Sequence, residues 1–175
     1  MEKLDLVGEL LYKWRIKNVF PLIEGKLLDL GCGTNQLVKK YGNGTGIDVY
    51  QFGGADLIIE DTSKTPFADN SFNTITILAA LNHIPNRREV LQEMYRILKP
   101  GGKIIITMIT PKISRIWHFI RGPFDRDQKE RGMKMGEVYG MTSKEVKQLL
   151  RNCNFEDIKE KKFMLGINNI TIAKK

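Results

Sequence analysis

The sequence predicts an α/β fold in which a mostly parallel sheet is covered by helices on both faces. Short runs of apolar and β-branched residues alternate with helix-like segments along the first 110 residues. These apolar runs are continuous, as is typical of strands that are buried on both sides in a parallel sheet. Close to the end of the chain, segments 155–163 and 168–173 are spaced like an antiparallel hairpin.

The first half of the chain supplies most of the expected elements. An amphipathic helix is predicted over residues 5–20, where apolar side chains recur at helical spacing, and a short helix over about 35–41. A longer helix is expected to start at Asn86, which can cap it together with Glu89, and to end at Pro100-Gly101-Gly102. The predicted parallel strands are 26–30, 44–49, 56–60, 72–78 and 103–109.

Residues 110–140 interrupt this alternation. They are polar, basic and rich in glycine, apart from a short apolar segment that predicts a helix near 113–120. Long loops on α/β folds are commonly lids or binding segments, so we expect a substrate-facing insertion here. Regular structure is predicted to return at Thr142, which forms a capping box with Glu145 ahead of another amphipathic helix.

Composition indicates one globular domain over residues 1–175, with a helical segment over 1–25. Hydrophobic residues make up 42% and charged residues 27% of the chain. We find no signal peptide and no run long enough to span a membrane, and we expect a cytoplasmic protein. The two cysteines, Cys32 and Cys153, are far apart and lack metal-ligand spacing, so neither a metal site nor a disulfide framework is predicted.

The positive charge is concentrated at the C-terminal end. Residues 1–111 hold 13 Lys and Arg against 12 Asp and Glu, whereas residues 112–175 hold 15 against 8. Such a basic segment suits RNA, an anionic lipid surface or an acidic substrate, and it is equally compatible with an ordinary solvated surface.

The stretch "LLDLGCGTNQL" (27–37) carries the clearest functional signal. A buried strand that runs into a glycine turn and a helix is a nucleotide-binding arrangement, because backbone N–H groups face the ligand. The dinucleotide fingerprint requires a small residue where this chain has Gln36, and no Lys-Ser/Thr pair of a phosphate loop follows. The turn therefore predicts a nucleotide-like ligand other than a pyrophosphate.

An acidic residue at the end of the next predicted strand strengthens this interpretation. Asp48 lies 19 residues after Asp29, where a carboxylate can accept hydrogen bonds from both hydroxyls of a ribose bound over the glycine turn. A single aspartate at a strand end is often only a loop or cap residue. Its combination with the glycine turn makes a ribose site the better interpretation.

Together these motifs resemble the class I S-adenosylmethionine-dependent methyltransferases, of the small-molecule group often called methyltransferase type 11. They follow in the order and spacing of the family and cover most of residues 26–175. The matching stretches are "LLDLGCGTN" (27–35), "GIDVY" (46–50), "EDTSKTPFADNSFNTI" (60–75), "ALNHIPNRREVLQEMYRILKPGG" (80–102) and "GMTSKEVKQLLRNCNF" (140–155). The resemblance implies a Rossmann-like, doubly wound, seven-stranded sheet whose last strand pair is antiparallel.

The resemblance also assigns the cofactor site. S-adenosylmethionine would bind with its methionine part over the glycine turn, its ammonium near Asp29 and its ribose on Asp48, and it would leave as S-adenosylhomocysteine. Asp61 would accept a bond from the adenine amino group. The implied cofactor residues are Asp29, Gly31, Cys32, Gly33, Asp48, Val49, Asp61, Thr62, Leu78 and Ala79. The family commonly has glycine where this chain has Asn35, and asparagine tolerates the same left-handed backbone.

Two residues are candidates for catalysis beyond the cofactor. His83 follows the fourth predicted strand and is the nearest candidate base, with a packing role as the alternative. Tyr139 precedes the capped helix, where its side chain could overhang the cleft or simply anchor the loop. A base is needed only if the acceptor loses a proton during methyl transfer.

Four functions can be weighed against these features. The leading hypothesis is a methyltransferase that acts on a small molecule. The basic C-terminal third allows an RNA methyltransferase, although the chain lacks the Asn/Asp-Pro-Pro-aromatic tetrapeptide and the nucleophilic cysteine used by such enzymes. A non-catalytic S-adenosylmethionine-binding protein is a third possibility. A dehydrogenase conflicts with Gln36 and with the downstream motifs.

Overall fold

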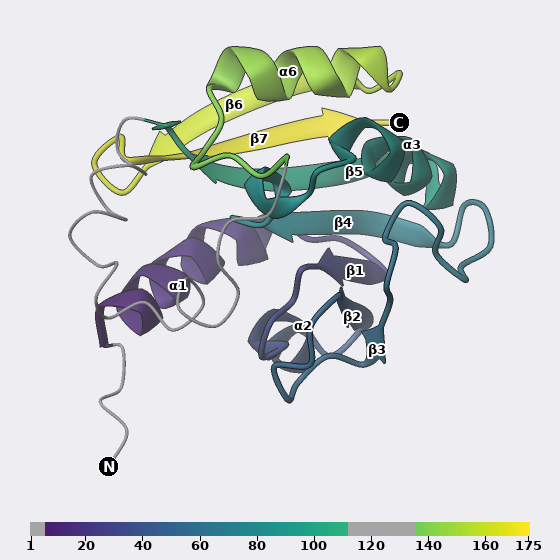
Figure 1. The fold of residues 1–175 in the computed structure, drawn as a ribbon, viewed down its shortest axis with the longest axis horizontal. Helices are drawn as coiled ribbons and strands as arrows, with labels where there is room; N and C mark the ends of the chain where they lie inside the picture. Colours follow the sequence, from purple (N-terminus) through teal and green to yellow (C-terminus); the bar gives the residue numbers. More distant parts are fainter. Residues whose placement is uncertain (1–5, 112–135) are drawn as a thin grey trace.

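The computed structural model describes residues 6–111 and 136–175, which fold around a seven-stranded sheet (Figure 1). The strands are β1 (Leu27–Leu30), β2 (Gly44–Asp48), β3 (Leu57–Ile58), β4 (Phe72–Leu78), β5 (Leu98–Ile109), β6 (Glu156–Phe163) and β7 (Asn168–Lys174). The helices are α1 (Leu6–Val19), α2 (Gln36–Tyr41), α3 (Arg87–Ile97) and α6 (Ser143–Asn152), with short 3-10 turns η1 (Phe20–Leu22) and η2 (Leu81–His83).

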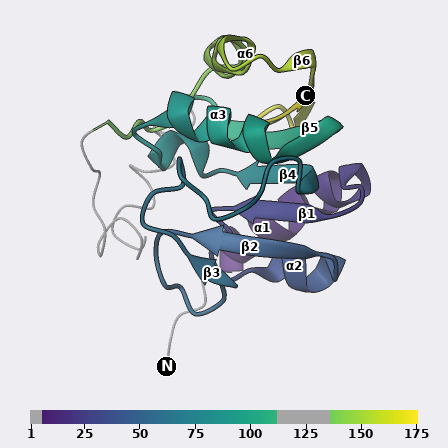
Figure 2. The same ribbon diagram turned by 90° about the vertical axis from the view of Figure 1, so that its right-hand side faces the viewer.

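The sheet has the predicted topology. Its strand order is β3-β2-β1-β4-β5-β7-β6, which runs from bottom to top in Figures 1 and 2. β1 to β5 are parallel, whereas β7 is antiparallel to both β5 and β6. The α/β fold with a doubly wound, mostly parallel sheet and an antiparallel C-terminal pair is therefore confirmed.

Two apolar clusters fill the two faces of the sheet. Leu28 and Leu30 of β1 belong to the cluster formed with α3 and α6, whereas Leu27 belongs to the cluster formed with α1 and α2. Successive side chains of a strand point to opposite faces, so Asp29 shares the α1 face with Leu27. This alternation decides which side of the sheet the Asp29 carboxyl group occupies.

The predicted capping box of α6 is confirmed. The Glu145 amide donates to Thr142 Oγ1 at 3.3 Å, and the Thr142 amide donates to Glu145 Oε2 at 2.7 Å. Asn86 is the N-cap residue of α3, as predicted, but its side chain makes no capping bond to the helix. Its Nδ2 donates to Asp61 Oδ1 at 3.4 Å.

The boundary between α3 and β5 also differs from the prediction. The helix ends at Ile97, and β5 begins at Leu98, five residues before the predicted start of that strand. Leu98 pairs with Phe72 before the register shifts and Lys103 pairs with Thr74. The Pro100-Gly101-Gly102 segment is thus a bulge within β5, where Gly101 has a φ of +74°.

The expected insertion at 110–140 is described only at its two ends, because residues 112–135, including the helix predicted near 113–120, lie outside the described part. No helix within residues 6–111 and 136–175 is long and apolar enough to cross a membrane.

Candidate cofactor-binding site

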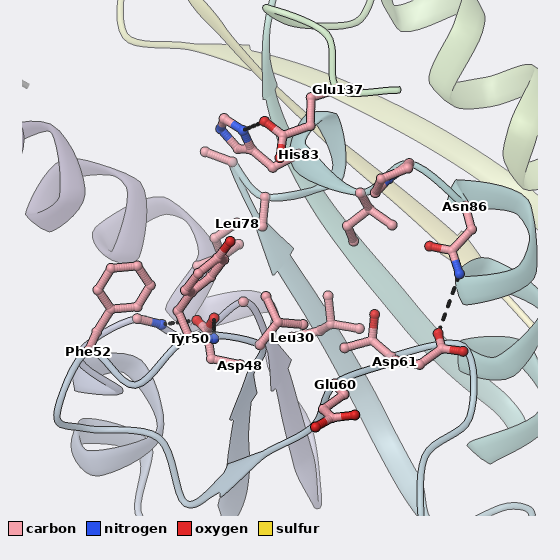
Figure 3. Close-up of a pocket in the computed structure, with 18 residues that line it drawn as sticks. Leu30, Asp48, Tyr50, Phe52, Glu60, Asp61, Leu78, His83, Asn86 and Glu137 are labelled. Carbon is pink, nitrogen blue, oxygen red and sulfur yellow. Dashed lines mark hydrogen bonds and ion pairs between the residues drawn. The ribbon is translucent and has the colours of Figure 1, made fainter. Parts of the chain in front are cut away.

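A cavity of about 520 Å³ opens at the carboxyl ends of β1, β2 and β4. This is the edge where ligands bind to open α/β sheets, and the volume suits a small organic ligand. Figure 3 shows its side chains: Asp48, Glu60 and Asp61 lie along one side, and His83 and Glu137 lie together on the other. The lining residues are Leu30, Gly31, Gly33, Asp48, Val49, Tyr50, Phe52, Glu60, Asp61, Thr62, Leu78, Ala79, Ala80, His83, Ile84, Pro85, Asn86 and Glu137.

The glycine turn forms one wall of the cavity. Gly31 has a φ of +74°, and a Cβ there would lie 2.7 Å from the Cβ of Ala80, so a side chain would be strained and would clash. Gly33 has a φ of +54°, and a Cβ at this position would meet no atom within 4 Å. The turn therefore presents bare backbone to the cavity, as close approach of a ligand requires.

Asn35 completes the turn in the left-handed conformation that the sequence predicts, with a φ of 59°. Its side chain is fully buried, and Nδ2 donates to Asp56 Oδ2 at 2.9 Å. A Cβ on Gly46 would come within 2.0 Å of Asn35 Oδ1, so β2 needs glycine beside this amide. The asparagine thus both supplies the backbone conformation and ties the turn to the β2–β3 connection.

Asp48 braces the glycine turn from the end of β2. Its Oδ2 accepts from the Gly33 amide at 2.9 Å, and its Oδ1 accepts from the Tyr50 amide at 3.0 Å. Each carboxylate oxygen has further lone pairs, so both can still accept a hydroxyl proton. A buried, oriented carboxylate in the cavity wall is the feature that the hydroxyls of a ribose require.

A second group of polar residues lines the end of the cavity next to α3. Asp61 Oδ1 accepts from Ser63 Oγ at 2.6 Å and from the Ser63 amide at 3.0 Å. The bonds from the side chain and amide of Ser63 lower the pKa of Asp61 below its ordinary value, so the residue is an acceptor at neutral pH. Thr62, which is buried, and Asn86 complete this end.

A second hollow lies between α1 and the glycine turn, and it shares Gly31, Gly33 and Leu78 with the cavity. Cys32 and Tyr12 also line it. Burial raises the pKa of the Cys32 thiol to about 12, so the group stays protonated and unreactive. The two hollows therefore adjoin each other at the glycine turn.

Asp29 lies beneath the turn and lines neither hollow. Its side chain is buried, and Oδ1 accepts from Thr76 Oγ1 at 2.6 Å. Burial raises the pKa of Asp29 to about 7, against the lowering effect of the Thr76 bond. A cation that approached through the hollow beneath α1 would shift this carboxyl group toward its ionised form.

The end of β4 provides the floor of the cavity. Ala79 has a φ of +54°, a left-handed conformation that is rare for residues with a side chain, and its amide donates to Thr107 O at 3.1 Å. Such backbone strain is concentrated at binding sites. Leu78 lies beside it, and η2 then turns His83 over the cavity (Figure 3).

The residues present therefore fit an adenosine that carries an amino-acid tail. The Asp48 carboxylate suits ribose hydroxyls, the Asp61 end suits an exocyclic amino group, and the bare glycine turn, with Asp29 buried beneath it, leads to the second hollow. A pyrophosphate would favour lysine or arginine side chains in its site, and among the described residues neither type lines either hollow.

Comparisons with known proteins agree with this chemistry. A family described as methyltransferase domain matches residues 28–106. The chain is 33% identical over 126 residues to the ubiquinone/menaquinone biosynthesis C-methyltransferase UbiE of Desulfotalea psychrophila, covering 65% of this chain and 51% of that protein. It is 30% identical over 137 residues to the demethylmenaquinone methyltransferase of Paenarthrobacter aurescens, covering 66% and 54%. The chain thus spans about half the length of these two relatives.

A solved structure from Thermotoga maritima, a methyltransferase dependent on S-adenosylmethionine and a possible histamine N-methyltransferase, superposes with a TM-score of 0.72 at 18% identity. The match covers 94% of this chain and 89% of that one. Together these matches support a class I S-adenosylmethionine-dependent methyltransferase and imply S-adenosylmethionine as its cofactor.

Most residues predicted for the methyltransferase site come together. Gly31, Gly33, Asp48, Val49, Asp61, Thr62, Leu78, Ala79 and His83 line the cavity, and Cys32 lines the adjoining hollow. Tyr139 lies outside the lining of both, with 42% of its surface exposed. Cys153 is buried against α3, with Sγ 3.6 Å from Arg88 O, and has a structural position.

Sequence reasoning missed several residues of the methyltransferase site. Glu60 and Tyr50 adjoin predicted residues, so their positions at strand ends could have identified them. Tyr12 could be assigned to the site only once the fold shows that α1 covers the glycine turn. Glu137 has no local signal, because it reaches the cavity only through the fold.

Proposed function

We propose that the protein transfers the methyl group of S-adenosylmethionine to a small-molecule acceptor that binds beside Leu78 and His83. The observation that carries this proposal is one cavity in which Asp48 and Asp61 lie on one side and His83 and Glu137 on the opposite side (Figure 3). Alignment of the acceptor with the methyl group and exclusion of water are then the main tasks of the protein.

We propose the following roles for the chain's own residues. Gly31 and Gly33 let the backbone approach the methionine part, while Asp48 holds the ribose and Asp61 the adenine amino group. Asp29 balances the ammonium from beneath the turn. Bound S-adenosylmethionine supplies an activated methyl group, so the protein need only position the acceptor in line with it.

Residues 110–140 are proposed to contribute to acceptor binding. The insertion leaves the sheet just after β5, and the described structure resumes at Gly136, beside the cavity residue Glu137. Both ends of the insertion thus adjoin the carboxyl edge of the sheet. This placement supports a role over the acceptor rather than over the adenine.

The names of the relatives support a small acceptor, since UbiE and the demethylmenaquinone methyltransferase are named for quinones. An RNA acceptor is the second candidate, favoured by the excess of positive charge in residues 112–175. Among the described lysines of this segment, Lys159, Lys161 and Lys162 are exposed on β6, the edge strand opposite β3. The charge on β6 therefore lies on the far side of the sheet from Asp48, as the small-molecule proposal expects.

The test uses methyl-labelled S-adenosylmethionine and purified protein, offered in parallel total RNA and a low-molecular-mass metabolite extract. We expect label in the metabolite fraction, where mass spectrometry then identifies the product. Label in RNA would replace the proposal with an RNA methyltransferase. Binding of S-adenosylhomocysteine without transfer to either fraction would support a non-catalytic cofactor-binding protein.

A further inference from the structure

His83 and Glu137 form a polar pair on the wall of the cavity that faces the acceptor side. His83 Nδ1 lies 3.2 Å from Glu137 Oε2, and both residues line the cavity (Figure 3). The Glu137 side chain is 2% exposed and that of His83 is 29% exposed. The histidine is therefore partly open, whereas the carboxylate behind it is shielded.

The backbone around this pair is held by hydrogen bonds between distant parts of the chain. The Val138 amide donates to Asn82 O at 3.0 Å, and Asn82 Nδ2 donates to Val138 O at 3.2 Å. Arg87 Nη2 donates to both Asn82 O at 2.9 Å and Gly136 O at 2.8 Å. These bonds fix the residues on either side of Glu137 against the turn that carries His83.

The chemistry of this contact determines the tautomer of the imidazole. An ionised carboxylate only accepts hydrogen bonds, so a neutral His83 must carry its proton on Nδ1. Nε2 is then the unprotonated nitrogen and is free to accept a proton. Among the described residues, the Arg87 guanidinium interacts with the charge of Glu137, and it also donates to backbone carbonyls.

We propose that Glu137 is a positioning residue that keeps His83 in the Nδ1–H tautomer, and that His83 Nε2 accepts a proton from an acceptor bearing an acidic hydroxyl, such as a phenol or hydroquinone. This inference rests on the proposed methyl transfer and names the class of its acceptor. The hydroxyl proton moves to Nε2, and the oxygen's electron pair forms the new bond to the methyl carbon. The electron pair of the broken C–S bond stays on sulfur, and the imidazolium later returns its proton to water.

The first test reads the tautomer and needs no acceptor. Two-bond ¹H–¹⁵N spectra of ¹⁵N-labelled protein at a pH where imidazole is neutral distinguish the two tautomers, and a His118→Gln variant assigns the signals because the chain has two histidines. We expect the Nδ1–H tautomer in the wild type and its loss in Glu137→Leu. An Nε2–H tautomer in the wild type, or no change in Glu137→Leu, would overturn the positioning role.

The second test uses the labelled metabolite fraction described above. His83→Gln should lower the initial rate of label transfer about 100-fold or more while affinity for S-adenosylhomocysteine is retained. Glu137→Leu should act in the same direction, and Glu89→Leu, at an exposed position of α3, serves as the matched control. An unchanged rate of label transfer in His83→Gln would refute the role of His83 as the base. A product whose labelled methyl group is not attached to a hydroxyl oxygen would refute the proposed acceptor class. Absence of label with wild-type protein would refute methyl transfer itself and, with it, the role of His83 as a base. The tautomer measurement would still test the positioning role of Glu137, because it needs no acceptor.

Discussion

Replacement of Asp29 by asparagine should change how the stability of the protein depends on pH. The wild-type carboxyl group is buried, and burial raises its pKa from 3.8 to about 7. Between these values the native state holds a proton that the unfolded state has lost, so the free energy of unfolding falls as pH rises. Asparagine keeps the shape and the acceptor for Thr76 Oγ1 but does not titrate.

The magnitude follows from the two pKa values. From pH 5 to pH 7 this side chain is ionised in the unfolded state and protonated in the native state. The free energy of unfolding of the wild type therefore falls by about 3 kcal/mol over this range. Above pH 7 both states are ionised, and no further loss is expected. The free energy of unfolding of Asp29→Asn minus that of the wild type should therefore increase by about 3 kcal/mol between pH 5 and pH 8.

Urea unfolding followed by circular dichroism at several pH values measures this difference, because all other titrating groups cancel between the two proteins. Asp157→Asn provides a control, since that side chain is 62% exposed beside Lys174. The free energy of unfolding of Asp157→Asn minus that of the wild type should stay constant between pH 5 and pH 8. A constant difference for Asp29→Asn as well would refute the account of a protonated, buried carboxyl group.

Three further outcomes are expected. Asp48→Ala should weaken binding of S-adenosylhomocysteine by about 2–3 kcal/mol in calorimetry, because a carboxylate that accepts hydroxyl protons is lost; unchanged affinity would refute the ribose site. Asn35→Ala should lower the free energy of unfolding by about 2 kcal/mol, because alanine is strained in the left-handed conformation and the buried hydrogen bond is lost. Asn35→Gly loses the bond without the strain and should lower it less; equal losses would show that strain does not contribute. Thr142→Ala should cost about 1 kcal/mol in thermal unfolding through the lost cap of α6, and no change would show that the capping box adds nothing.

The sequence predicts the parts of the fold that depend on local patterns. Continuous apolar runs identify parallel strands because both faces of such a sheet are covered, and the spacing of the last two strands identifies their antiparallel pairing. The left-handed Asn35 is likewise predictable, because few other residues adopt that backbone cheaply.

The errors arise where a local signal competes with a distant partner. Asn86 stands at the N-cap of α3 as its preference predicts, but its Nδ2 donates to the distant Asp61 and its side-chain oxygen accepts no helix amide. The Pro100-Gly101-Gly102 segment resembles a helix terminator, yet pairing of Leu98 with Phe72 draws it into β5 as a bulge. Neither outcome can be read from spacing along the chain.

The candidate site divides in the same way. The glycine turn and Asp48 lie at the ends of two consecutive strands, so local patterns are enough to predict both. Glu137 lies 54 residues after His83, in a segment without periodicity, and it reaches the cavity because Asn82 and Arg87 bind the backbone of its two neighbours.

Calorimetric titration of the purified protein with S-adenosylhomocysteine, and separately with NAD, tests the central claim most directly. We expect one binding site per chain for S-adenosylhomocysteine, binding weakened by about 2–3 kcal/mol in Asp48→Ala, and no heat of binding with NAD. Binding of NAD in the absence of binding of S-adenosylhomocysteine would contradict the assignment of the cavity and, with it, the proposed methyl transfer.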